Sequence, residues 1–146
     1  MQAITRRAAM ALAALPVVAV ASETEESFEA AQRAILAGRT PRTDGITIDM
    51  AQLSENGNSV DIALSVDSPT TAADHVTAIH ILAEKNPVAR VARFDLSPRA
   101  GQAAVATRIR LATTQTILVL AETSRGEVHR AQQEVIVILG ACVDGG

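Results

Sequence analysis

The chain has 146 residues, of which 48% are apolar, and this length provides one domain with a single modest core. Its 13 Lys and Arg residues stand against 16 Asp and Glu, and the net charge of −3 excludes the basic surface of a protein that binds nucleic acid or anionic membranes. With two Phe and no Trp or Tyr, base stacking and aromatic binding hot spots are excluded too.

Residues 1–21 have the pattern of an export signal. Arg6 and Arg7 form a basic start, an apolar run follows over 8–20, and small residues allow cleavage after about Ala21. The adjacent arginines favour the twin-arginine route, with an ordinary secretory signal as the alternative. Because the apolar run is too short for a stable spanning helix, we expect an exported protein without a membrane anchor.

A short helix and a linker are predicted within residues 22–40. Acidic residues precede apolar ones at helical spacing, namely Phe28, Ala31, Ile35 and Leu36. Gly38 follows the pattern and Pro41 breaks it, so the helix is expected to end before them.

Residues 41–139 change to a period of two, which predicts strands. The clearest is SVDIALSV, and further strands are expected in GITIDM, VTAIHILA, VARFDL, AVATRIRLA, TILVLAE, EVHRA and QEVIVIL. The segment Glu55-Asn56-Gly57-Asn58 is expected to be a tight turn with positive φ angles. Since no helical segment is long enough for parallel crossovers, the series predicts an all-β, antiparallel sandwich.

The polar side chains of this region give little support for catalysis. His75, His80 and His129 are expected to be solvated, and Arg108 and Arg110 to be surface charges on an outward strand face. Neither a metal-ligand spacing nor a phosphate or dinucleotide motif is present, so no metal site, catalytic residue or cofactor is predicted.

Cys142, the only cysteine, lies in the last seven residues, a glycine-containing segment over 140–146. Extended, this segment can reach on the order of 25 Å from the sheet at roughly 3.3–3.6 Å per residue. An unused thiol is a liability in an oxidising compartment, and the negative charges of Asp144 and the terminal carboxylate disfavour its thiolate. Four interpretations follow: a group carrier activated by other proteins, an intersubunit disulfide in a non-catalytic scaffold, an enzyme nucleophile, or a frayed end without a role.

Four segments together resemble the SoxY family, the sulfur-carrying subunit of the thiosulfate-oxidising Sox system: ENGNSVDIALSVDSP, HVTAIHILAEKNPVARVARFDLSP, ATRIRLATTQTILVLAE and VIVILGAC. The resemblance implies a periplasmic Ig-like sandwich that pairs with SoxZ and carries sulfur covalently on Cys142. It also implies a protein that is not an enzyme and needs no cofactor besides the bound sulfur. SoxAX would join thiosulfate to the thiol, SoxB would release sulfate, and a sulfane dehydrogenase would oxidise the remaining sulfur.

The tip departs from the family's usual ending, Gly-Gly-Cys-Gly-Gly. In this chain the predicted carrier arm consists of Gly140, Ala141, Cys142, Val143, Asp144, Gly145 and Gly146. Val143 is stiff at χ1, and Asp144 adds negative charge beside an anionic cargo. Two interpretations of the departure stay open: a member that serves a different client enzyme, or one that has lost carrier activity.

Overall fold

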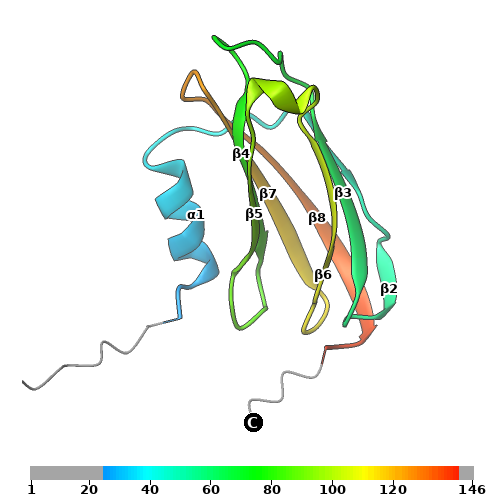
Figure 1. Ribbon diagram of the computed structural model, residues 1–146. Coiled ribbons are helices and arrows are strands. Elements are labelled where there is room, and N and C mark those ends of the chain that lie inside the picture. The colour runs from blue at the N-terminus through cyan, green and yellow to red at the C-terminus, as the bar shows by residue number, and fades with distance from the viewer. Residues whose placement is uncertain (1–24, 142–146) are drawn as a thin grey trace, which may run out of the picture.

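A computed structural model describes residues 25–141, which form one α-helix and two β-sheets packed face to face (Figure 1). The sheets have the orders β1-β3-β6 and β2-β8-β7-β4-β5. The elements are α1 (Phe28–Leu36), β1 (Ile46–Asp49), β2 (Leu53–Asn56), β3 (Val60–Val66), β4 (Val76–Ala83), β5 (Arg90–Asp95), a short 3-10 turn (Pro98–Ala100), β6 (Ala104–Ile109), β7 (Gln115–Thr123) and β8 (Val128–Leu139). The predicted Ig-like β-sandwich is confirmed.

The core between the sheets is built from the alternation that the sequence predicts. In β3, Val60, Ile62 and Leu64 are almost completely buried, whereas Asp61 and Ser65 are exposed. Each large apolar side chain that is buried in this way stabilises the fold by about 1.5–3 kcal/mol before entropy is counted.

Helix α1 lies on the outer face of the five-stranded sheet and creates a second apolar layer (Figure 1). The helix begins after Ser27, whose hydroxyl oxygen accepts a hydrogen bond of 3.1 Å from a first-turn N–H. Ala31 and Ile35 pack against Leu118 and Leu120, so β4 and β7 are buried on both faces. The helix predicted from residues 22–40 is confirmed, and no helix within residues 25–141 is long and apolar enough to cross a membrane.

The prediction of solvated histidines was wrong for His80, which α1 covers, and for His129, which packs against the segment before β1. Both are buried: Nε2 of His80 lies 2.7 Å from a carboxylate oxygen of Glu122, and Nδ1 of His129 lies 2.9 Å from the carbonyl oxygen of Asp44. His80 does face away from the central core, as its position in the strand indicates, but α1 covers that face. Only His75, in a turn, is partly exposed.

The C-terminal strand also differs from its prediction. β8 runs unbroken over twelve residues, where the sequence predicted two strands, EVHRA and QEVIVIL. Gln132 and Gln133 interrupt the apolar pattern but remain in the ladder with β7. β2 was not predicted at all, because it contains a single apolar residue, and it pairs with β8 in parallel, the one parallel pair among the strands over residues 25–141.

Candidate functional site

β8 brings the chain to one end of the sandwich, where it meets three connections between other strands. These are the β2–β3 turn (57–59), the β4–β5 turn (84–89) and the β6–β7 loop (110–114), and we call this region the arm end (Figure 1). The predicted arm residues Cys142, Val143, Asp144, Gly145 and Gly146 lie outside the described residues. The last described residue, Ala141, is the one bonded to the predicted attachment cysteine.

Ala141 is held against the sandwich. Its backbone N–H donates a hydrogen bond of 2.9 Å to the carbonyl oxygen of Leu111 in the β6–β7 loop. Only 8% of Ala141 is exposed, although it directly precedes the predicted attachment cysteine. The folded domain therefore extends two residues beyond the end of β8 at Leu139.

Gly140 makes a close approach that a larger residue cannot make. A Cβ atom at this position would lie 2.1 Å from the carbonyl oxygen of Ala112 and 3.1 Å from its carbon. Both are backbone atoms, so no side-chain rotation can relieve the clash. Gly140 is thus needed for packing against the β6–β7 loop, in addition to the flexibility for which glycine is chosen in arms.

Gly57 completes this contact from the β2–β3 turn. Its N–H donates to the carbonyl oxygen of Leu139 at 2.7 Å, and its own carbonyl oxygen accepts from the N–H of Leu111 at 2.8 Å. A Cβ atom at Gly57 would lie 2.3 Å from the carbonyl oxygen of Leu111 and 3.0 Å from the nitrogen of Ala141. Three chain segments thus meet in one backbone junction, which we call the arm junction: Gly57, Leu111, Ala112, Leu139, Gly140 and Ala141.

The expectation of positive φ angles in the β2–β3 turn was wrong. Neither Gly57 nor Asn58 is among the residues of the described chain that have positive φ. Glu55 and Asn56 belong to β2, and glycine is required at position 57 by the approach of Leu111 instead. No sequence signal separates a glycine needed for its φ angle from one needed for close packing.

A hydrogen-bonded amide pair, half-buried Asn86 and buried Gln115, supports the β6–β7 loop. The side-chain oxygen of Asn86 accepts from the N–H of Ala112 at 3.0 Å and from Nε2 of Gln115 at 2.8 Å. Nδ2 of Asn86 donates to the carbonyl oxygen of Arg110 at 2.7 Å, and Gln115 is almost fully buried. Asn86 precedes Pro87, a pair typical of a turn, and nothing local in the sequence predicts this supporting role.

Exposed apolar side chains lie on β2 and β8 beside the arm junction. Leu53 is 51% exposed and is the register partner of Ile136, which is 50% exposed. Ile138 lies two residues further along β8, on the same face, and is 61% exposed. We call Leu53, Ile136 and Ile138 the β2–β8 patch; α1 leaves this part of the outer sheet face uncovered.

The histidines, all three of which fall in the described part of the chain, lie away from the arm end. His129 precedes Leu139 by ten residues of β8, or about 33 Å at 3.3 Å per residue. His80 lies beneath α1, and the N–H of His75 donates to the β7–β8 turn at the opposite end. Within residues 25–141 there is no group of three or more His, Cys, Asp or Glu side chains that could hold a metal ion.

The two arginines expected on an outward face are exposed, as predicted. Nε of Arg108 donates to a carboxylate oxygen of Asp61 across β3 and β6 at 2.9 Å, with both side chains largely in solvent. The Arg110 guanidinium donates to the side-chain oxygen of Asn58 at 3.3 Å. Such exposed contacts contribute little to stability and do not form an anion clamp.

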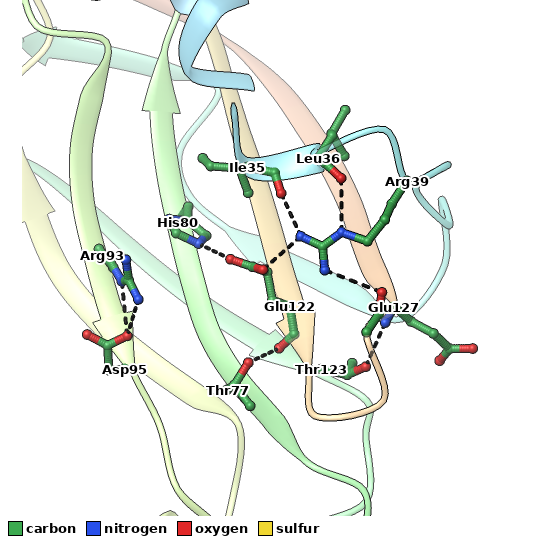
Figure 2. Close-up of polar contacts among 11 residues, drawn as sticks. Ile35, Leu36, Arg39, Thr77, His80, Arg93, Asp95, Glu122, Thr123 and Glu127 are labelled. Carbon is green, nitrogen blue, oxygen red and sulfur yellow. Dashed lines mark hydrogen bonds and ion pairs between the residues drawn. The ribbon is translucent and has the colours of Figure 1, made fainter. Parts of the chain in front are cut away.

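A second, partly buried polar network lies beneath α1 (Figure 2). One carboxylate oxygen of Glu122 accepts from Arg39 at 2.8 Å, and Arg39 also donates to the carbonyl oxygens of Ile35 and Leu36. Burial by itself raises the pKa of Glu122, but the hydrogen bonds from Arg39 and His80 outweigh it and hold that pKa below its ordinary value. This network fastens the helix C-terminus to the sheet and is remote from the arm end.

The comparisons with known proteins agree on one family. The family model of the sulfur oxidation protein SoxY matches residues 31–142, so the match ends on Cys142. The structure of the sulfur carrier protein SoxY from Chlorobium limicola f. thiosulfatophilum is similar, with a TM-score of 0.61 and 30% sequence identity, over 76% of this chain and 98% of that one.

Two superoxide reductases share the architecture. A superoxide reductase (neelaredoxin) from Ignicoccus hospitalis has a TM-score of 0.57 at 16% identity, over 75% of this chain and 91% of its own. The superoxide reductase from Nanoarchaeum equitans has a TM-score of 0.54 at 10% identity, over 66% and 100%. At such identities the likeness shows the fold alone, and no curated protein sequence matches the chain.

Proposed function

The chain belongs to the SoxY family of sulfur oxidation proteins, and from that premise we propose that it carries sulfur covalently on Cys142. The observation that carries the proposal is the position of this residue. Cys142 is the only cysteine, the family match ends on it, and it is bonded to the last residue held at the arm end.

The proposed cycle uses the thiolate of Cys142 as the acceptor. A haem enzyme of the SoxAX type removes two electrons while an S–S bond forms: Cys–S⁻ plus thiosulfate gives Cys–S–S–SO₃⁻. A SoxB-type hydrolase then adds water and breaks the S–SO₃ bond, which releases sulfate and two protons and leaves Cys–S–S⁻. A sulfane dehydrogenase then removes six electrons from the outer sulfur, which takes its oxygens from three water molecules, and Cys–S–SO₃⁻ and six protons result. A second hydrolysis releases sulfate and two protons and restores the thiolate, so this chain contributes the attachment point.

The arrangement of the described residues favours a carrier over an enzyme. All three histidines lie away from the arm end, so none can serve as a general base for Cys142 in this arrangement. Activation of the thiol is therefore assigned to the partner enzymes, which meet the carrier at its exposed end. A thiol that its own protein does not activate is suited to holding a cargo between reactions.

A second sandwich subunit of the SoxZ kind is the proposed permanent partner. The β2–β8 patch supports this part of the proposal, because contiguous exposed apolar side chains on a small protein commonly mark an interaction surface. The alternative, a scaffold in which Cys142 forms an intersubunit disulfide, rests on the single thiol of an exported chain. Export to the periplasm through residues 1–21 belongs to the same proposal.

Mass spectrometry tests the carrier directly. The protein is purified from its host during growth on thiosulfate, and the C-terminal peptide is expected to contain sulfane and thiosulfonate adducts. Cys142→Ser is the matched control, which should fold normally and carry no adduct. Unmodified Cys142 during turnover, or a covalent dimer as the only native species on non-reducing gels, would overturn the proposal.

A further inference from the structure

We infer that Gly57 and Gly140 are positioning residues for sulfur transfer: the arm junction fixes the point from which the cargo-bearing residue leaves the sandwich. The inference rests on the proposed role of Cys142. Its consequence is that partner enzymes come to the arm end to reach the sulfur, because the seven-residue segment after Leu139 does not swing freely as a whole.

Several backbone hydrogen bonds hold the arm junction together. Three backbone hydrogen bonds of 2.7–2.9 Å join Gly57, Leu111, Leu139 and Ala141. They connect segments far apart in the chain, and Ala141 is buried to 92%. A merely frayed end would leave its N–H groups to water, as chain termini usually do.

The two glycines of the arm junction pack closely against backbone atoms of the β6–β7 loop. Gly140 brings its α-carbon against the carbonyl oxygen of Ala112, and Gly57 brings its own against the carbonyl oxygen of Leu111. At both positions an added Cβ would come within 2.3 Å of a backbone oxygen. Such a clash can be relieved only if the glycine's own segment or the β6–β7 loop moves. The junction therefore depends on two residues without side chains, in two different segments.

Covalent geometry limits how far Cys142 can lie from Ala141. Consecutive α-carbons are about 3.8 Å apart across a trans peptide bond, so the α-carbon of Cys142 stays within that distance of the α-carbon of Ala141. While Ala141 remains bonded to Leu111, the attachment residue is one peptide unit from a fixed point. Longer reach requires the arm junction to open.

Two measurements on the intact protein test this without using sulfur. Amide exchange of Ala141, followed by NMR, should be slowed in the native protein relative to an unstructured peptide, and Gly140→Ala should accelerate it by roughly tenfold or more. A nitroxide attached to Cys142, the only cysteine, should give a restricted spectrum that becomes more mobile in Gly140→Ala and in Gly57→Ala.

Gly126→Ala is the matched control. Gly126 lies in the β7–β8 turn at the opposite end, with φ of +83° and nothing within 4 Å of its Cβ position. The substitution strains the backbone and lowers stability, so it shows what destabilisation alone does, and the label at Cys142 should keep its spectrum.

The outcomes separate this inference from the carrier proposal. An Ala141 amide that exchanges as in an unstructured peptide, or that is unaffected by Gly140→Ala, would overturn the positioning role even if sulfur adducts form. Amide exchange of Ala141 in the native protein needs no variant, so this measurement tests the inference even if both substitutions prevent folding. Conversely, a protected Ala141 on a chain that never accepts sulfur would leave the junction intact and refute the carrier.

Discussion

Nε2 of His80 lies 2.7 Å from Oε1 of Glu122, in the layer between the five-stranded sheet and α1 (Figure 2). The other oxygen of Glu122 accepts from Arg39, so one carboxylate holds a strand residue and the end of the helix together. The helix is thus attached through a charged group whose protonation weakens the attachment.

Glu122→Gln should lower the free energy of unfolding by about 1–2 kcal/mol at neutral pH, because it removes the charge that Arg39 and His80 face in a partly buried site. Urea titration measures the change. Asp95→Asn is the control, since Asp95 pairs with Arg93 in solvent, and its effect should stay within about 0.5 kcal/mol. Equal effects of the two substitutions would contradict the role assigned to Glu122.

Stability should also depend on pH through the same residue. The pKa of Glu122 is lowered in the folded protein, so the folded state binds its proton less readily than the unfolded chain does. The stabilisation is complete above the ordinary pKa of a Glu side chain, about 4.3, and is lost as the pH falls from there through the lower pKa of folded Glu122. The loss measured between pH 5 and pH 3 should be smaller in Glu122→Gln than in the native protein.

Ile138→Asp should weaken binding of the SoxZ-like partner at least about tenfold, because a charge would replace an exposed apolar side chain of the β2–β8 patch. Val88→Asp is the matched control: Val88 is 63% exposed but lies in the β4–β5 turn, outside the patch. Isothermal titration of each variant with the purified partner compares the two. Unchanged affinity in Ile138→Asp would exclude the β2–β8 patch as the partner surface.

Asn86→Ala should destabilise the protein by about 1–3 kcal/mol. The N–H of Ala112 and the amide of Gln115 would lose their shared acceptor, the side-chain oxygen of Asn86, in a partly buried site. Asn58→Ala removes only an exposed contact to Arg110 and should have little effect. Thermal unfolding of both variants measures the difference, and a comparable loss in Asn58→Ala would show that Asn86 has no special supporting role.

Deleting Val143 and Asp144 should speed loading of thiosulfate-derived sulfur onto Cys142. The deletion removes a stiff side chain and a negative charge beside an anionic cargo, and it returns the ending to Cys-Gly-Gly. The rate of adduct formation with purified partner enzymes measures the effect, with Asp144→Asn separating charge from length. A slower rate in both variants would show that this tip is suited to its own client.

Much of the fold could be predicted because alternation and burial agree. β1, β3, β6 and α1 follow patterns that need only one apolar face. β2 could not be predicted, since Leu53 is its single apolar residue and its pairing with β8 is decided by a distant segment. His80 was misjudged for a similar reason, because nothing local shows that a helix ending 44 residues earlier, at Leu36, covers its face.

The candidate site, like the fold, could be predicted from the sequence only in part. The sequence shows a single cysteine near the end of the chain. It also shows the family pattern that implies a role for this cysteine. The sequence does not show the junction of Gly57, Leu111 and Ala141, because backbone atoms make this contact and their meeting depends on tertiary structure. Side-chain identity carries almost no signal for such contacts.

β8 also avoids a hazard common to long terminal strands. Leu53 and its neighbours in β2 pair with the arm-proximal part of its outer edge, and Arg42 exchanges backbone hydrogen bonds with Val128 and Arg130 at the other end. A strand edge that is already paired offers few free N–H and C=O groups to another copy. The free edges of the five-stranded sheet are therefore those of β5 and of the short strand β2, and β8 itself offers little of its backbone to sheet extension by another copy of the chain.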